Sequence, residues 1–440
     1  MKTAKSIPTS KIKRAGKILK TGFKVGKNYA SYYGEKIINS DVSKEKLDKN
    51  NASDIMESLL ELKGSGLKVA QMLSMEENLL PKAYTDMFSL AQFSVPPLSA
   101  PLVKKTFKRY FGKGPEEVFD GFDYESKYAA SIGQVHEAWL NDQKLAVKIQ
   151  YPGVAESIKS DLALLKPMAG TLLRFKMKDT EKYFQEVENK LFEETNYDLE
   201  LKNSIELTEA CKWMPGFKFP TYYPEYSSER IITMEWIEGK HLSTSIKEGL
   251  SQAVRNSIGQ RLWDFFNFQV HALHKVHADP HPGNFLITED QDVVALDFGC
   301  IKEIPEDFYN SYFEVLNPKV LEDRDHFDRV MTDLEVYLPE DSTEERAYFS
   351  NVFHEMLSLV LQPFHQGNFD FGDKAYFTEL TSLGERLSKE SLMNSYNPSR
   401  GSTHFIYINR TFFGLYNLLH LLKAEIDTTV DQSITSPTKK

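Results

Sequence analysis

Residues 277–284 read HADPHPGN, and residues 296–299 read LDFG. These stretches place Asn284 five positions after Asp279, and Asp297 eighteen positions after it. Phosphoryl transfer from ATP requires oxygen ligands that hold Mg²⁺ against the phosphates and a carboxylate beside the attacking nucleophile. An Asp, an Asn five residues later and an Asp-Phe-Gly form this set in protein kinases. We therefore expect Asn284 and Asp297 to bind Mg²⁺, and Asp279 to orient or deprotonate a nucleophile.

Upstream, Lys148 lies in an apolar segment, LAVKI, that is typical of a buried strand. A buried lysine is unfavourable unless an anion pairs with it, and a nucleotide phosphate together with a helix glutamate would meet that need. Glu194 and Glu200 lie in a helix predicted over residues 186–203, and their spacing does not place them on one face. Only one of them can be the partner. The alternatives are solvated surface positions for these glutamates and a surface strand for Lys148.

The segment YAASIGQV, residues 128–135, stands where a kinase covers its nucleotide with a glycine-rich loop. Glycines allow the backbone to approach the phosphates closely. This segment has two alanines and one glycine, which argues against an ordinary protein kinase. We expect the nucleotide to contact Ala129, Ala130, Ser131, Ile132, Gly133 and Gln134.

The segment MEWIEG, residues 234–239, leaves a predicted strand and enters a glycine. In a two-lobed kinase this position is the hinge, whose backbone groups bind adenine. We expect Glu235 and Ile237 to supply those groups, and an ordinary strand end is the alternative.

The surrounding pattern predicts an α+β, bilobal protein-kinase-like fold with an N-terminal helical extension and a mostly helical C-lobe. A chain of 440 residues exceeds one comfortable core. Strands are predicted at 135–140 and 144–150, joined by a turn at Asn141-Asp142, and at 217–222, 230–235, 285–287 and 293–296. The predicted parts are a basic arm (1–40), a helical extension (41–112), an N-lobe (113–239), a C-lobe (240–428) and a disordered tail (429–440).

Charge is distributed unevenly along the chain. The formal net charge is −10, yet residues 1–34 carry nine Lys or Arg and no Asp or Glu, so the remainder carries 44 − 63 = −19. A nucleic-acid-binding domain should itself be basic, so nucleic acid is not an expected partner. Residues 10–30 show the spacing of a basic amphipathic helix that can lie on an anionic membrane lipid surface. A disordered solubilising tail and a targeting peptide are the alternatives.

No run of eighteen apolar residues is present, and the N-terminus lacks the apolar core of a secretory signal. Cys211 and Cys300 suggest neither a disulfide framework nor a metal-binding pair. We expect a cytoplasmic protein without a transmembrane helix, whose membrane association is peripheral. Histidines recur in the order His271, His274, His277 and His281. They span a predicted helix end and a proline-rich loop, which favours core and loop positions over a zinc site.

Together these residues resemble the ABC1/UbiB (ADCK/AarF) family of atypical protein-kinase-like proteins, which are associated with quinone and lipid metabolism. The resemblance rests on KVAQ at 68–71 (similar to the family's KxGQ), AASIGQVH at 129–136, AVK at 146–148, Glu194 to Glu200, HADPHPGN and DFG. It implies that Lys148 contacts the α- and β-phosphates of ATP with Glu200 as its partner. It also implies that Lys68, Gln71 and Glu194 belong to a regulatory extension over the active site.

Two positions depart from the family pattern. Ala70 replaces the glycine of KxGQ, and Asn196 replaces the aspartate of a Glu-x-Asp motif. The leading hypothesis is an ATPase that binds ATP and Mg²⁺ and supports isoprenoid-quinone or lipid metabolism, with proteins of such a pathway as partners. A true kinase acting on a protein or small molecule is the first alternative. A nucleotide-sensing scaffold without catalysis, which the two departures leave open, is the second.

Overall fold

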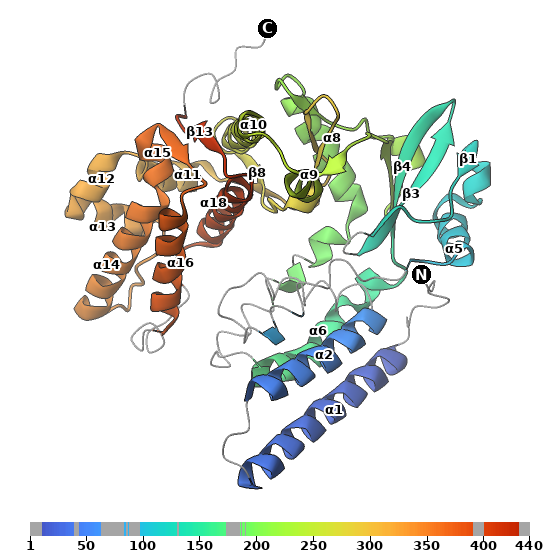
Figure 1. The fold of residues 1–440 in the computed structure, drawn as a ribbon, viewed down its shortest axis with the longest axis horizontal. Coiled ribbons are helices and arrows are strands. Elements are labelled where there is room, and N and C mark those ends of the chain that lie inside the picture. The colour runs from blue at the N-terminus through green and yellow to red at the C-terminus, as the bar shows by residue number, and fades with distance from the viewer. Residues whose placement is uncertain are drawn as a thin grey trace. The chain divides into compact units, whose positions relative to one another are not determined.

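The computed structural model describes residues 11–38, 44–62, 83–84, 87, 97–129, 132–172, 185, 187–189, 191–389 and 400–430. Contacts divide the chain into two compact units (Figure 1). The first unit comprises Met1–Lys202 and Thr221–Trp236, and the second comprises Asn203–Pro220 and Ile237–Lys440. The predicted limits of the arm, extension, lobes and tail stay predictions.

An antiparallel sheet of five strands forms the centre of the first unit, in the order β1-β3-β4-β6 with β2 paired to β3. The strands are β1 (Gly121–Phe122), β2 (Tyr128–Ala129), β3 (Gly133–Leu140), β4 (Gln143–Gln150) and β6 (Ile231–Glu235). Asn141 and Asp142 join β3 to β4 with φ values of 51° and 64°. Two left-handed residues match the twist of a tight hairpin. The predicted hairpin and its turn are confirmed.

Helices complete the first unit: α1 (Lys11–Ile38), α2 (Lys44–Leu62), α5 (Ala100–Phe111) and α6 (Val154–Leu172). The short helices η2 (Pro115–Glu117) and η3 (Pro224–Tyr226) lie in its loops. Pro101 stands in the first turn of α5, and Gly112 ends it with φ 73°, as expected for residues that start and stop a helix. Phe107 of α5 packs edge-on against Phe119 and Phe122.

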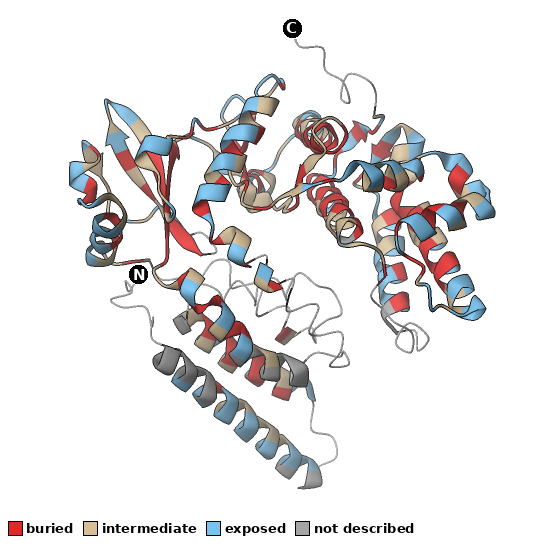
Figure 2. Ribbon diagram, turned by 180° about the vertical axis from the view of Figure 1, so that it is seen from behind, coloured by how far each residue is buried: buried red, intermediate tan, exposed pale blue. Residues whose placement is uncertain are grey.

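The described part of the basic arm is a helix that contacts α2 and α6. Lys24 Nζ lies 2.8 Å from Glu57 Oε2 and 3.3 Å from Asp54 Oδ1, while Asn28 Nδ2 donates to Asp54 Oδ2 at 2.9 Å. Exposed and half-buried positions predominate along α1 (Figure 2). The predicted basic helix thus lies within α1, and the choice among a membrane-surface helix, a solubilising tail and a targeting peptide stays a prediction.

The second unit is mostly helical. Its helices are α8 (Tyr197–Cys211, which begins in the first unit), α9 (Leu242–Glu248), α10 (Gln252–His271), α11 (Glu306–Glu314), α12 (Pro318–Glu322), α13 (Arg324–Asp333), α14 (Thr343–Val360), α15 (Gln362–Gln366), α16 (Lys374–Lys389), α18 (Thr403–Leu422) and the short η4 (Pro282–Asn284). Its strands are β5 (Phe217–Lys218), β7 (Lys240–His241), β8 (Lys275–His277), β9 (Phe285–Ile287), β10 (Val293–Ala295), β11 (Ile301–Glu303), β12 (Asn368–Asp370) and β13 (Glu425–Asp427). They pair as β5-β10-β9-β7, β11-β8 and β12-β13.

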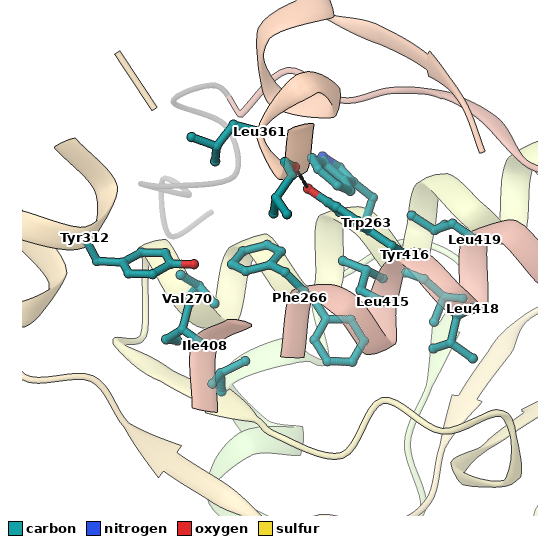
Figure 3. Packing of buried hydrophobic residues seen from close by; sticks show 14 of the residues in the cluster. Trp263, Phe266, Val270, Tyr312, Leu361, Ile408, Leu415, Tyr416, Leu418 and Leu419 are labelled. Carbon is teal, nitrogen blue, oxygen red and sulfur yellow. Dashed lines mark hydrogen bonds between the residues drawn. The ribbon is translucent and has the colours of Figure 1, made fainter. Parts of the chain in front are cut away.

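Two long helices, α10 and α18, dominate the core of this unit. Trp263 and Phe266 of α10 are fully buried, as are Leu415 and Tyr416 of α18 (Figure 3). Tyr416 also donates its hydroxyl to the carbonyl of Val360 at 2.9 Å, which satisfies a polar group that would otherwise be costly to bury. The helical C-lobe thus has its own apolar core.

Amide side chains of α10 hydrogen-bond the backbone around β13. Gln260 donates to the carbonyl of Asp427 and accepts from its N–H, both at 2.9 Å. Asn256 Oδ1 accepts from Glu425 N at 3.0 Å, and Gln252 Nε2 donates to Lys423 O at 2.8 Å. Because these amides recur every four residues, they lie in one row on the helix.

Two secondary-structure predictions are wrong. The helix predicted over 186–203 is interrupted, because Thr195 forms a turn and α8 starts only at Tyr197. Asn196 Oδ1 accepts from Leu199 N at 3.1 Å, as a helix-capping asparagine does. The strand predicted over 217–222 contains only β5, and Tyr222 instead forms an isolated bridge with Met234 in the first unit.

Within the described residues, none of the helices combines the length and the apolar character needed to span a bilayer.

A buried histidine lies in each unit. His136 Nδ1 is 2.9 Å from Asp123 O, and His271 Nδ1 is 2.9 Å from the Tyr309 hydroxyl. Burial lowers the pKa of each imidazole to about 4, and repulsion from His274 adds to this effect at His271. Both rings are therefore neutral near pH 7.

These histidines predict acid-sensitive folding. An unfolded histidine binds a proton near its ordinary pKa of about 6.5, whereas the folded ones do so only near pH 4, so stability falls as the pH drops between these values. When the pH drops from about 7 to about 5, each of the two histidines should lower the free energy of unfolding by about 2 kcal/mol. Urea denaturation of wild type and His136→Asn checks this. The variant should lose about 2 kcal/mol less over this range, and an identical loss in both proteins would contradict the prediction.

Candidate functional site

Lys148 lies in the middle of β4, between Val135 of β3 and Ile232 of β6. Its side chain is nearly inaccessible, since the residue is only 8% exposed. Its Nζ is 2.5 Å from Glu200 Oε1, and Glu200 is only 5% exposed. Of the two candidate glutamates, Glu200 is therefore the one that the structure pairs with Lys148.

The start of α8 is anchored so that Glu200 faces the sheet. The carbonyl of Thr195 accepts from Gln150 Nε2 at 3.0 Å and from Arg230 Nη1 at 2.7 Å. Asn196 then caps the helix, a role that asparagine and aspartate fill about equally well. The Asn196 departure therefore keeps the helix start intact. Glu194 is half-buried and lies before the turn at Thr195.

The single glycine of the alanine-rich loop serves a packing role. Gly133 pairs with Gln150 in the sheet, and a β-carbon there would lie 2.5 Å from Ile149 O and 2.9 Å from the Tyr197 hydroxyl. Only glycine leaves room for these neighbours. Ala129 closes the loop on its other side by pairing with Gln134.

Two side chains expected at the nucleotide point into the protein instead. Ile132 belongs to the apolar core, and the Gln134 side chain is fully buried and hydrogen-bonded. At these positions only backbone atoms remain as candidate nucleotide contacts. Four further expected residues lie outside the described part of the chain: Lys68, Gln71, Ala130 and Ser131.

The expected hinge coincides with the division between the two units, which falls after Trp236. Glu235 ends β6, and its Oε2 accepts from the Thr221 hydroxyl at 3.0 Å. The Trp236 ring stacks on Tyr128 at 5.9 Å, and Lys144 Nζ lies 4.3 Å from its centroid. Ile237 is the first residue of the second unit's main segment.

The loop between β8 and β9 carries Asp279 and Asn284. Asn284 Nδ2 donates to the carbonyl of Asp279 at 3.0 Å, and Gly283 N donates to His281 Nδ1 at 3.1 Å. Because its nitrogen is used in this way, Asn284 can present its amide oxygen to a cation. That oxygen is the atom through which asparagine binds Mg²⁺.

Two backbone hydrogen bonds join this loop to the Asp-Phe-Gly segment. Leu296 N donates to Asn284 O at 3.0 Å, and Ala278 N donates to Cys300 O at 2.8 Å. Asp297 Oδ1 accepts from Gly299 N at 2.9 Å, which orients its carboxylate. The three motif residues are thus held on adjoining segments of one unit. A carboxylate and an amide oxygen fit the ligand preference of Mg²⁺.

Gly414 supports this loop and was not predicted from the sequence. A β-carbon at Gly414 of α18 would lie 2.3 Å from Pro280 Cγ and 3.3 Å from its carbonyl oxygen. The close approach places α18 directly against the residue that follows Asp279. A glycine inside an otherwise apolar helical run was the available signal.

The four histidines occupy separate environments. His271 contacts the Tyr309 hydroxyl, and His274 stacks on the same ring at 4.3 Å. His277 packs against Phe298, while His281 accepts from Gly283. Among the residues that the structure describes, no group of three or more His, Cys, Asp or Glu could hold a metal ion.

Comparison with known proteins decides the family. The model of the ABC1 atypical kinase-like domain matches residues 90–331, more than half of the chain. The chain belongs to the ABC1 atypical kinase-like family. The predicted membership in the ABC1/UbiB (ADCK/AarF) family is confirmed.

Similar curated proteins carry kinase names. A Saccharomyces cerevisiae protein, the mitochondrial atypical kinase COQ8, is 31% identical over 72% of this chain and 65% of its own length. An uncharacterised chloroplastic aarF domain-containing protein kinase of Arabidopsis thaliana is 30% identical over 66% of this chain. That alignment spans only 42% of the plant protein. The chain thus matches roughly half the length of these relatives.

A solved structure supports the fold. A Mycobacterium tuberculosis protein in complex with erythromycin has a TM-score of 0.62 and 25% identity, and the match covers 89% of this chain and 97% of that protein. The predicted α+β, two-lobed kinase-like fold is confirmed.

Proposed function

We propose that this protein is an ATPase of the atypical-kinase type that binds Mg²⁺-ATP and supports isoprenoid-quinone or lipid metabolism at a membrane surface. The observation that carries the proposal is the hydrogen-bonded arrangement of Asp279, Asn284 and the segment around Asp297. The names of relatives such as the mitochondrial atypical kinase COQ8 support it at the level of the family.

The proposed roles follow the chemistry of each side chain. Lys148, held by Glu200, contacts the α- and β-phosphates. Asn284 and Asp297 would hold Mg²⁺, which would neutralise the negative charge that develops on the phosphates. Asp279 orients a water molecule and takes its proton as the oxygen bonds to the γ-phosphorus and the bond to the ADP oxygen breaks.

Contacts to the rest of the nucleotide come from the backbone. The loop at residues 129–134 covers the phosphates, and Glu235 and Ile237 bind adenine at the hinge. Alanines in this loop disfavour the close approach of the backbone to the phosphates that an ordinary protein kinase uses. For this reason we propose ATP hydrolysis ahead of kinase activity. A kinase acting on a protein or small molecule is the second candidate, favoured by the retained Asp279 and by the kinase names of relatives.

Asp297→Asn should lower Mg²⁺-ATP turnover at least about 100-fold, because it weakens a metal ligand that acts on the transition state. Turnover is measured with and without anionic liposomes. Asp290→Asn is the matched control, since Asp290 is an exposed aspartate in the nearby turn between β9 and β10. Equal turnover in wild type and Asp297→Asn would overturn the assignment. Labelled phosphate on a defined acceptor, lost in Asp279→Asn, would favour the kinase, and nucleotide binding without turnover would favour a scaffold.

The membrane part of the proposal rests on the outer side of α1. Phe23 is 79% exposed, and the exposed residues Lys20 and Lys27 lie one turn away on either side. Lys24 is excluded from this surface because it pairs with Glu57. An apolar side chain between cations is typical of a helix that lies on anionic lipid.

Reversing charge at Lys20→Glu and Lys27→Glu should weaken liposome binding at least about tenfold, since each lysine near an anionic surface contributes about 1 kcal/mol. Sedimentation with anionic vesicles at low and high salt measures this. Lys247→Glu, a reversal at an exposed lysine of α9, is the control. Equal sedimentation of the α1 variant and wild type would remove the argument for membrane contact.

A further inference from the structure

The buried Gln134 side chain lies between two partners in the first unit. Its Oε1 accepts from the backbone N–H of Leu98 at 2.7 Å, and its Nε2 is 2.6 Å from His136 Nε2. His136 Nδ1 lies 2.9 Å from the carbonyl oxygen of Asp123. A series of hydrogen bonds thus joins three segments of the polypeptide, at Leu98, at Asp123 and at Gln134 to His136.

Each hydrogen bond in this series has a single possible direction. The carbonyl of Asp123 can only accept, so His136 must carry its proton on Nδ1. A neutral imidazole has one proton, which makes Nε2 an acceptor for the Gln134 amide nitrogen. The Gln134 oxygen then faces Leu98 N–H. Turning the amide over would place donor against donor at Leu98 and acceptor against acceptor at His136.

This series of hydrogen bonds begins next to the loop that is expected to bind the nucleotide. Gln134 directly follows Gly133 and pairs in the sheet with Ala129 on the other side of the loop. Leu98 directly precedes Ser99, the N-cap residue of α5. A bound nucleotide that fixes the backbone at Ala129 and Gly133 would therefore also fix the partner of Leu98.

We propose that Gln134 and His136 are positioning residues that couple nucleotide binding at the backbone of Ala129 and Gly133 to the ordering of the backbone at Leu98. The coupling rests on the proposed nucleotide site. It is reciprocal, since a segment that is stabilised by the nucleotide must itself stabilise the bound nucleotide.

Hydrogen exchange of the Leu98 amide tests this coupling in the full-length wild-type protein. Addition of Mg²⁺ and a non-hydrolysable ATP analogue should slow that exchange several-fold. Failure of the wild type to bind the analogue would overturn both the proposed function and the coupling. Binding of the analogue with unchanged Leu98 exchange would overturn the coupling alone.

Two variants of Gln134 separate positioning from general packing. Gln134→Met keeps the volume but removes the acceptor, so Leu98 should lose its protection and the analogue should bind about tenfold more weakly. Gln134→Glu keeps an acceptor for Leu98 and places a carboxylate beside His136 Nε2. It should retain Leu98 protection, while the ¹⁵N signals of His136 change from the neutral Nδ1–H form to the doubly protonated form.

Gln143→Met, at the exposed start of β4, is the matched control and should leave Leu98 exchange and binding unchanged. Equal analogue affinity in Gln134→Met and wild type, with Leu98 still protected, would also overturn the proposal.

Discussion

Lys148→Met should lower the free energy of unfolding by about 3–5 kcal/mol, because it leaves the Glu200 carboxylate buried without its cation. The two side chains are almost inaccessible, and Nζ lies 2.5 Å from Oε1. If the proposed site is correct, the same substitution should also abolish nucleotide binding, because Lys148 is the cation proposed to contact the phosphates. Urea denaturation followed by circular dichroism measures the first effect, and titration with a fluorescent ATP analogue measures the second.

A double variant separates these two effects. Lys148→Met combined with Glu200→Gln removes both charges, so stability should recover by most of the lost free energy while nucleotide binding stays absent. Lys240→Met breaks an exposed ion pair with Glu248 and should cost less than about 1 kcal/mol. If the single and double variants of Lys148 were equally unstable, the buried charge of Glu200 would not be the cause.

Gly414→Ala should reduce ATP turnover about 100-fold at saturating nucleotide, because the added methyl group displaces Pro280 and the adjacent Asp279. A β-carbon there would lie 2.3 Å from Pro280 Cγ, and displacement of a catalytic group by about 1 Å can cost this much. Nucleotide affinity should change much less, since Lys148 is untouched. Steady-state turnover and equilibrium titration separate the two quantities.

Gly384→Ala in α16 is the matched control. The same substitution there meets no atom within 4 Å, so it should keep full turnover and gain up to about 1 kcal/mol in stability from the better helix propensity of alanine. Equal turnover in the two variants would contradict a supporting role for Gly414.

The local parts of the fold could be predicted from the sequence. The Asn141-Asp142 turn between two strand-like segments identified β3 and β4, and the motif strands β9 and β10 appeared within one residue of their predicted limits. These features depend on residues that are close together in the sequence. The catalytic roles assigned to the motif residues stay predictions.

Long-range contacts explain what could not be predicted. The helix break at Thr195 depends on Gln150 and Arg230, which lie far away in sequence and hold its carbonyl. The choice of Glu200 over Glu194 follows from that break, because helical spacing alone treats the two glutamates alike. The role of Gly414 depends on a contact with Pro280 that no local pattern contains.

The row of amide side chains on α10 has a consequence for association between molecules. A strand with an unpaired edge can template pairing with another chain, and among the residues that the structure describes β12 is the one strand that pairs with β13. Gln252, Asn256 and Gln260 hydrogen-bond the backbone along its other side. A helix surface thus acts as the missing neighbouring strand, and this edge is closed to intermolecular strand addition.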